Sequence, residues 1–495
     1  MLNSLIPGLG DRVHQPNLNF APQLGLAWDP TGKGQTSIRG GIGLFYENVL
    51  TTVSPIDPLF RATRGQIFLQ RPVACAASAF PLPVQTPEGA LQPTFCGTPG
   101  GGPIAIGAVG GQIAAFQKQY QADFPFDLNA PNPNYLGTLL GKGQGLNGAG
   151  PPLDPGYLTP RSVEMNIGIQ REIFGGTILS ADFIRNVQTH YFLVIDENHT
   201  GDVRYFSKAA AQHAIAATLS LCGVSSIDQA IISCPTNPVG PNQLGYTPRA
   251  ATMADFAQNG LTSSADFNAV CSFSSVTVPG ATYGCAFPGV NPGAPPLGFL
   301  KPIGRSVYNG LQTKLVQSLG RPFKGIRSLN FQVSYAISRF ENSGGAQPAV
   351  PINSDQEYGV AAIDGANPNR FFGPSVLDRT HQLSFGGSAD FPRGFRVSIL
   401  SHFWSPLSTS LVVPATNLGP GEIFRTDFTG DGTFPDLVPG THVGSFDRGI
   451  SGSNINRVLS NYNNTTALNL TPAGQLLVQN GLFTPAQLGV GDSRC

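Results

Sequence analysis

Apolar and polar residues alternate with a period of two in several stretches of the chain, most clearly between residues 305 and 341. The second half of this stretch places every other side chain on one apolar face, at Leu329, Phe331, Val333, Tyr335 and Ile337. A period of two indicates a strand with one apolar and one polar face. Glycine and proline at 320–325 predict a tight turn between two arms. Each arm has about a dozen residues, which exceeds the common strand of about 5–6 and suits a membrane-crossing strand of about 9–11.

The same pattern recurs and predicts four hairpins, at about 19–47, 161–188, 305–341 and 378–403. Long segments rich in glycine and proline separate and follow them, at about 48–160, 191–304, 342–377 and 405–495. Within these segments we expect short helices at 112–122, 207–222, 227–233, 471–480 and 484–488. Tight turns that alternate with long loops are rare in soluble domains and typical of outer-membrane barrels.

This organisation predicts an all-β fold. We expect one domain over residues 1–495, a partial antiparallel transmembrane β-barrel with about eight long strands in four hairpins. The apolar faces of the strands would contact lipid and the polar faces would line a lumen. The long segments would be external loops that carry the short helices.

Composition agrees with this fold and excludes several other classes. Charged residues make up 12% of the chain, about half the usual share, and 61 glycines with 43 prolines argue against a helical protein. The net charge of zero gives no sign of nucleic-acid binding. No apolar run reaches the roughly 18 residues of a transmembrane helix. The first residues lack the basic and apolar regions of a signal peptide. The seven histidines are scattered and no catalytic motif is present, so we expect no enzyme activity.

Six of the seven cysteines group as neighbours within single segments between strands. Local pairing would give the disulfides Cys75–Cys96, Cys222–Cys234 and Cys271–Cys285, and would imply an oxidising compartment. Other connectivities and free buried thiols remain alternatives.

Side chains with oxygen atoms recur over residues 427–436, at Asp427, Thr429, Asp431, Thr433 and Asp436. With Gly432 permitting a sharp turn, this spacing is similar to a calcium-binding loop. The glutamate that normally closes such a loop is absent, and Asp436 stands in its place. The alternative is an Asp/Gly turn without metal. Calcium is the single cofactor that the sequence suggests.

Charged and polar residues on or beside the predicted strands are candidates for a polar network that lines the lumen. They are Arg39, Glu164, Asp182, Asp378, Arg379, His381 and Arg396. Their expected role is structural, through ion pairs across the lumen wall, with contact to substrate as the alternative.

Five segments resemble the Oar-like TonB-dependent receptors of the outer membrane, in the order of that family: 20–48, 162–186, 306–319, 333–345 and 372–398. Among them are FAPQLGLAWDPTGKGQTSIRGGIGLFYEN and FGPSVLDRTHQLSFGGSADFPRGFRVS. The resemblance covers the hairpins well and the loops poorly. It implies a plugged barrel of about 22 strands that imports or binds a large substrate with energy from TonB.

The chain departs from the pattern of that family. A plug, a TonB-contacting region and an aromatic-ended closing strand are not found, so we expect a fragment from the middle and later part of such a barrel. Alone, this fragment would neither insert nor transport, because lipid cannot satisfy unpaired strand edges.

We therefore expect an outer-membrane TonB-dependent receptor or transporter fragment, located in the bacterial cell outer membrane. It would form barrel wall and ligand-binding external loops for an unknown large substrate. Its partners would be outer-membrane lipid, that ligand and, through regions missing from this chain, the TonB complex. The alternative is a secreted or surface-anchored β-rich adhesin without a transport role, whose apolar strand faces would be buried under a second sheet. A small closed barrel porin is a third interpretation.

Overall fold

The computed structural model describes most of the predicted strands and part of the segments between them. The main described ranges are 16–47, 153–235, 248–263, 284–292, 296–343, 360–413, 421–434, 436–446, 451–467 and 469–488. The chain forms two compact units, one of Met1–Val49 with Gly150–Cys495 and one of Leu50–Ala149. In the second unit, β3 (Val84–Thr86) pairs with β4 (Gly89–Leu91). The helix predicted at 112–122 lies outside the described residues.

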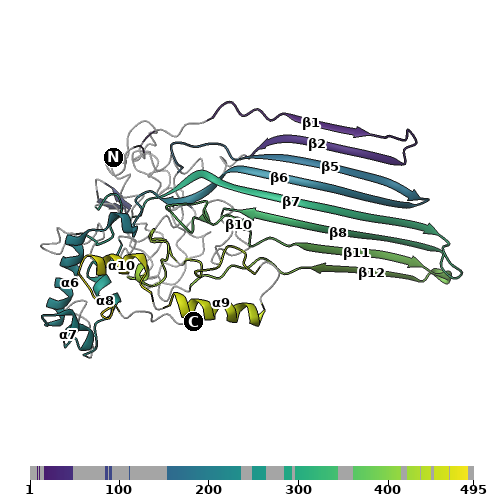
Figure 1. Cartoon of the computed structure of the whole chain (residues 1–495). Helices are drawn as coiled ribbons and strands as arrows, with labels where there is room; N and C mark the ends of the chain where they lie inside the picture. Colours follow the sequence, from purple (N-terminus) through teal and green to yellow (C-terminus); the bar gives the residue numbers. More distant parts are fainter. Residues whose placement is uncertain are drawn as a thin grey trace. The chain divides into compact units, whose positions relative to one another are not determined.

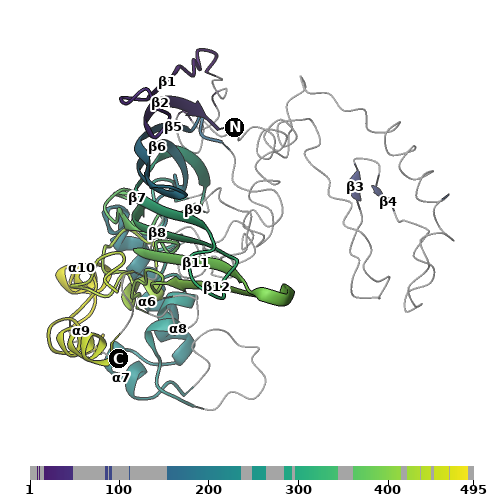
Figure 2. The same cartoon turned by 90° about the vertical axis from the view of Figure 1, so that its right-hand side faces the viewer.

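Eight long strands of the first unit form one continuous antiparallel sheet, in the order in which they follow along the chain (Figure 1). They are β1 (Gln23–Trp28), β2 (Thr36–Tyr46), β5 (Arg161–Phe174), β6 (Thr177–Asp196), β7 (Gly298–Gly320), β8 (Ser328–Asn342), β11 (His381–Asp390) and β12 (Arg396–Trp404). Figure 2 looks along the strands and shows this succession from β1 to β12. Two short strands join the sheet: β9 (Val360–Ala361) pairs with β6 and β10 (Gly373–Pro374) pairs with β8. The four predicted hairpins are confirmed.

Strands β6 and β7 continue past the predicted hairpin ends at 188 and 305. Their register shifts between Thr189 and Leu193, where His190 adopts a positive φ of 63°. Beyond this point the sequence YFLVI, residues 191–195, is apolar at every position, and the adjacent residues Phe192 and Leu193 are both buried. A strand that is covered on both faces loses the alternation that marks a half-exposed strand. The period of two therefore predicted only part of each strand, residues 177–188 of β6 and 305–320 of β7.

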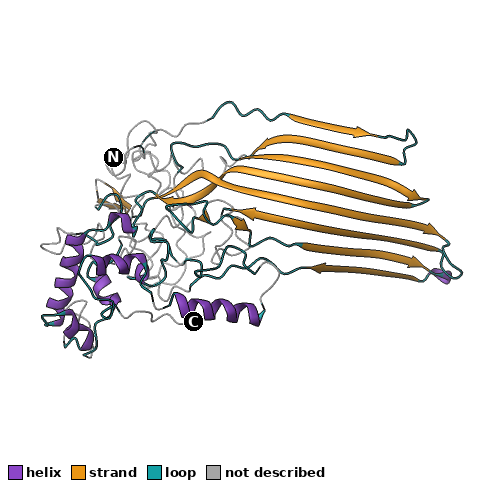
Figure 3. Ribbon diagram, in the orientation of Figure 1, coloured by secondary structure: helices purple, strands orange, loops and turns teal. Residues whose placement is uncertain are grey.

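The helices belong to the long segments between and after the hairpins (Figure 3). Helices α6 (Lys208–Cys222), α7 (Ile227–Ile232) and α10 (Pro472–Gln479) confirm predictions. Ser207 caps α6 by accepting from the Ala210 amide, and Gly223 ends the helix with a left-handed φ of 67°. The helix predicted at 484–488 is wrong, because the chain makes a single turn there, in which Leu488 N donates to Thr484 O.

Two helices were not predicted: α8 (Met253–Gln258) and α9 (Gly452–Thr465). Asn and Ser dominate α9, and these residues have a weak helix propensity, so its sequence resembles a loop. Among the helices of the described ranges, none has the length and hydropathy to cross a bilayer.

One face of the sheet leaves large apolar side chains exposed. Ile167 of β5 is 62% exposed, Ile399 of β12 is 56% exposed and Ile337 of β8 is 40% exposed. The buried core lies instead in the helical segments, where Phe256, Phe287 and Leu477 belong to one apolar cluster. A soluble sandwich would bury the apolar strand faces under a second sheet. These exposures contradict that interpretation and fit a sheet whose apolar face contacts lipid.

Candidate functional site

An ion pair on the polar face of the sheet joins strands that are not neighbours. Arg39 of β2 and Asp182 of β6 lie in one row, with Gly168 of β5 between them. Arg39 Nε donates to Asp182 Oδ1 at 3.0 Å, and Nη2 donates to Oδ2 at 2.8 Å. A Cβ on residue 168 would collide with the Asp182 carboxylate. Glycine at this position therefore lets the two charged side chains meet above the middle strand.

The other predicted network residues on this face form separate contacts. Glu164 accepts hydrogen bonds at 3.3 Å from Ser162 Oγ and Asn186 Nδ2. Arg396 pairs with Asp390 across the β11–β12 hairpin, with Nε and Oδ1 2.5 Å apart. Strand register places this pair on the same face as Arg39 and Asp182. The polar face thus carries local clusters along the sheet, where the sequence predicted one network.

His381 was predicted to lie in the lumen network, and this prediction is wrong. It is paired with Ile337 in the register of β11 and β8, and so lies on the apolar face. Its Nδ1 is 2.8 Å from the Tyr335 hydroxyl on the same face. The sequence alone does not show on which face of the sheet a histidine at the start of a strand lies, because this depends on the strand register.

Asp378 and Arg379 lie just before β11 and connect its start to the neighbouring strands. The Asp378 carboxylate accepts from the Phe340 amide at 2.7 Å and lies 3.9 Å from Arg339 Nη1. Arg379 Nη1 donates to the Ser405 carbonyl at 2.7 Å. These two residues therefore fix the ends of neighbouring strands to each other.

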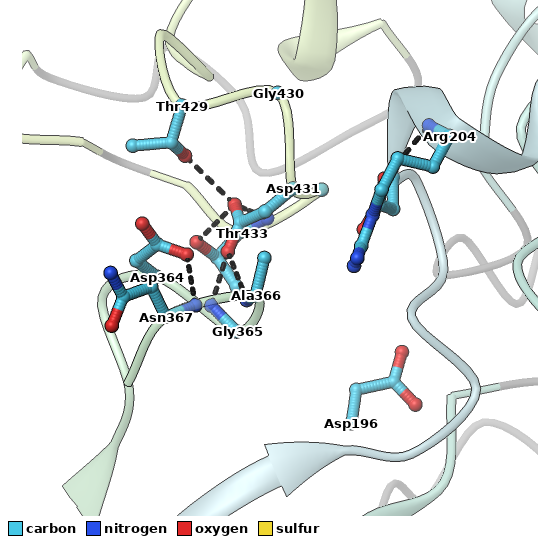
Figure 4. A network of polar contacts seen from close by, with 12 residues as sticks. Asp196, Arg204, Asp364, Gly365, Ala366, Asn367, Thr429, Gly430, Asp431 and Thr433 are labelled. Atoms are coloured by element: carbon cyan, nitrogen blue, oxygen red, sulfur yellow. Dashed lines mark hydrogen bonds and ion pairs between the residues drawn. The ribbon is translucent and has the colours of Figure 1, made fainter. Parts of the chain in front are cut away.

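A second polar cluster lies in the helical segments, around the carboxylate of Asp431 (Figure 4). Asp431 Oδ1 accepts from Thr429 Oγ1 at 2.9 Å and from the Thr433 amide at 3.0 Å. Oδ2 accepts from the amides of Gly365 and Ala366. One buried carboxylate thereby ties residues 427–436 to residues 363–367, which lie about 65 positions away in the sequence.

The two other acids of this loop also accept hydrogen bonds from its own backbone. Asp427 accepts from the amides of Gly430 at 2.5 Å and Gly432 at 2.9 Å. Asp436 Oδ2 accepts from the Thr429 amide at 2.8 Å. Carboxylates used in this way build an Asp/Gly turn. Within the described ranges, no three His, Cys, Asp or Glu side chains are grouped so that they could hold a metal ion. Calcium binding here stays a prediction, and these contacts favour the turn.

Burial changes the acidity of this loop. It raises the pKa of Asp427 well above the usual value, and the nearby Asp431 and Asp436 raise it further. The pKa of Asp431 is also raised, mainly by burial. The pKa of Asp436 rises to about 7, again mainly because the carboxyl is buried. Three carboxylates so close together resist full ionisation, because each charge loses its hydration and repels the others.

Three of the six cysteines predicted to form disulfides lie within the described residues. Cys222 at the end of α6 and Cys234 after α7 form a disulfide with an S–S distance of 2.14 Å. Cys285 is also disulfide-bonded. Cys75, Cys96 and Cys271 lie outside the described residues.

A cavity of about 600 Å³ lies among the helical segments. Its walls come from α8, from residues 421–428, and from the region of α9 and α10. Aromatic side chains and a few polar ones line it, among them Phe256, Phe424, Arg425, Tyr462 and Phe483. No local pattern in the sequence indicates this cavity, because its lining residues are spread between positions 231 and 488.

The fold and the polar face define a class of protein: a membrane β-barrel with long, structured loops. The chain matches the family model described as outer membrane beta barrel domain over residues 7–473, and it belongs to that family. Its place is the bacterial outer membrane. The comparison with curated proteins found no match.

Among solved structures, the chain is similar to the outer membrane transporter YddB from Escherichia coli. The two share 8% sequence identity at a TM-score of 0.35. The similarity covers 82% of this chain and 31% of the transporter, so the chain spans about a third of the length of that protein.

Proposed function

We propose that this chain forms barrel wall and external loops of an Oar-like TonB-dependent receptor that takes up a large ligand. The open sheet carries this proposal. Within the described residues, β1 pairs only with β2 and β12 pairs only with β11. An unpaired strand edge in hydrocarbon costs several kcal/mol for each backbone group that lacks a partner. We infer that further strands complete the wall, as the resemblance to large receptors implies.

The helical segments supply the ligand-binding part of this proposal. They have their own apolar core, a disulfide and the cavity of about 600 Å³. Loops that only connect strands need none of these features. Contact with the TonB complex would be made by regions outside these 495 residues.

Conductance and assembly of the isolated chain test the proposal. Exported behind a signal peptide, the chain should not assemble in an outer membrane, whereas it should refold in detergent micelles, where water reaches the strand edges. Refolded protein should open no stable channel in a planar bilayer. Assembly into a heat-modifiable form with steady single-channel steps would instead indicate a small closed porin and contradict the proposal.

The dependence on TonB needs a separate measurement. In the source bacterium, chemical cross-linking should join TonB to the protein that contains this chain, at a segment outside these 495 residues. Absence of any such cross-link, under conditions that capture another TonB-dependent receptor in the same cells, would remove TonB from the proposal.

A further inference from the structure

The short turns between β7 and β8 and between β11 and β12 carry an excess of positive charge. Their exposed cations are Arg321, Lys324, Arg327, Arg393 and Arg396. Asp390 is the single acidic residue within 320–328 and 390–396, and it is paired with Arg396. The other two hairpin turns are balanced, with Asp29 and Lys33 in one and Arg171 and Glu172 beside the other. The excess of positive charge is therefore confined to the turns that connect β7 to β8 and β11 to β12.

Two of the arginines adopt a backbone conformation that favours glycine. Arg321 has a φ of 53° and Arg393 has a φ of 67°. In this left-handed region, Cβ lies too close to the backbone, so a turn normally places glycine or asparagine there. Both turns thus accept strain that a glycine would remove. Strain of this kind at two neighbouring turns points to a use for the side chains themselves.

An apolar groove of about 300 Å³ lies next to these turns, on the lipid-facing side of β8, β11 and β12. Gly387 and Ala389 of β11 form its floor. The register sets Ala389 beside Leu329 and Val397, and Gly387 beside Phe331 and Ile399. The groove exists because two small residues lie between rows of larger ones. Its shape suits a flexible hydrocarbon chain.

Exposed aromatic side chains flank the turns at the same end of the sheet. Phe323 is 67% exposed and Phe395 is 63% exposed. Aromatic residues at strand ends mark the level of the lipid headgroups in membrane barrels. The cations of the adjacent turns therefore lie near lipid phosphates, and the groove begins where the acyl chains begin.

We propose that this end of the sheet is a binding site for an anionic phospholipid. The headgroup phosphate contacts Arg321, Lys324 and Arg393, and one acyl chain occupies the groove at Gly387. Cations near a membrane surface favour acidic lipids. Short turns of bacterial barrels face the periplasm, which places the bound lipid in the inner leaflet. The proposal depends on neither TonB nor the transported ligand.

Lipid retention by the full chain in detergent micelles tests the site. Native mass spectrometry would count the lipids retained from an equimolar mixture of phosphatidylglycerol and phosphatidylethanolamine with identical acyl chains. We expect the unmodified chain to retain the anionic lipid in about fivefold excess. Equal retention of the two lipids would overturn the proposal.

Paired variants separate charge from backbone conformation. Arg321→Gly with Arg393→Gly should abolish the preference for the anionic lipid without lowering the thermal stability of the fold. Arg321→Asn with Arg393→Asn gives a second neutral pair that also tolerates a positive φ. Arg321→Lys with Arg393→Lys should keep the preference.

Lys33→Gln, in the balanced β1–β2 turn, is the matched control and should also keep the preference for the anionic lipid. If the control loses as much preference as the glycine pair, the site is wrong.

Filling the groove tests the acyl-chain half of the site. Ala389→Phe places a ring on its floor, in a strand that tolerates aromatic residues. Total lipid retention should fall severalfold, while the ratio of anionic to zwitterionic lipid in the remainder stays in favour of the anionic lipid. Unchanged retention would show that the groove holds no acyl chain and would overturn that half of the proposal.

Discussion

Gly168 shows how one residue without a side chain can organise two charged neighbours. Glycine in a strand usually weakens it, since it has no side chain to pack and loses more entropy on folding. Here it opens a gap through which Arg39 and Asp182 meet, two strands apart. The Arg39 side chain is 42% exposed, so this ion pair contributes at most about 1 kcal/mol by itself. Its larger effect is on position, because it locks β2, β5 and β6 in one register.

Replacing Gly168 by alanine should destabilise the sheet. The new Cβ would displace the Asp182 carboxylate and separate it from Arg39, and overpacking of this kind costs about 1–3 kcal/mol. Denaturant unfolding in micelles would measure the change. Gly25→Ala is the matched control, because Gly25 lies on a strand with nothing within 4 Å of the new Cβ. Equal stability of the two variants would contradict the role assigned to Gly168.

At the scale of single elements, the loop 427–436 behaves as a folded unit. Its buried acids accept hydrogen bonds from its own amides and from those of residues 365 and 366. Gly432 allows the close approach that this needs, since a Cβ there would collide with the Thr200 carbonyl. The elevated pKa of Asp436, about 7 against a usual 3.8, means that the folded loop holds protons that the unfolded loop would release.

This loop should be more stable in mild acid than in mild base. A group whose pKa is raised on folding adds stability below its unfolded value, and this stability is lost as the pH rises through the folded value. For Asp436 the window runs from about 4 to about 7. Hydrogen–deuterium exchange, corrected for intrinsic rates, should show stronger protection of residues 427–436 at pH 5 than at pH 8. Asp436→Asn should flatten this difference. Protection that rises with pH would contradict the assignment.

The sequence predicted the strands far better than the loops, for a physical reason. A strand with one face in lipid must alternate, so residues 328–338 and 382–390 show their structure in a local pattern. The β6 extension is buried on both faces and loses that pattern. The Asp427–Asp436 spacing was visible, but its partners Gly365 and Ala366 are brought there only by the fold. The walls of the cavity likewise share no local pattern.

At the scale of the whole molecule, the assignment of faces decides which side chains meet lipid. The chain has two tryptophans, one on each edge strand of the described sheet. Trp28 of β1 pairs with Ile38 and lies on the apolar face. Trp404 of β12 pairs with Gln382 and lies on the polar face. Both are more than half exposed, so each reports on the solvent of its own face.

Fluorescence quenching should therefore distinguish the two tryptophans. In lipid-containing micelles, brominated lipid should quench Trp28 strongly in a Trp404→Phe variant. In a Trp28→Phe variant, aqueous acrylamide should quench Trp404 more strongly than brominated lipid does. The two variants differ only in which face carries the probe, so each is the control of the other. Similar quenching of both by brominated lipid would mean that the faces are assigned wrongly.

The apolar cluster of the helical segments has a consequence for the order of assembly. It joins Ala214 of α6 to Leu477 of α10, and Gln487 near its edge donates to Asp228 at 2.8 Å across 259 positions. Contacts this distant form late, because the intervening chain must first be ordered. Here the intervening chain contains β7, β8, β11 and β12, half of the described sheet. We expect the helices to pack against one another only after these four strands have paired, so formation of the helical cluster would report that this half of the sheet is in place.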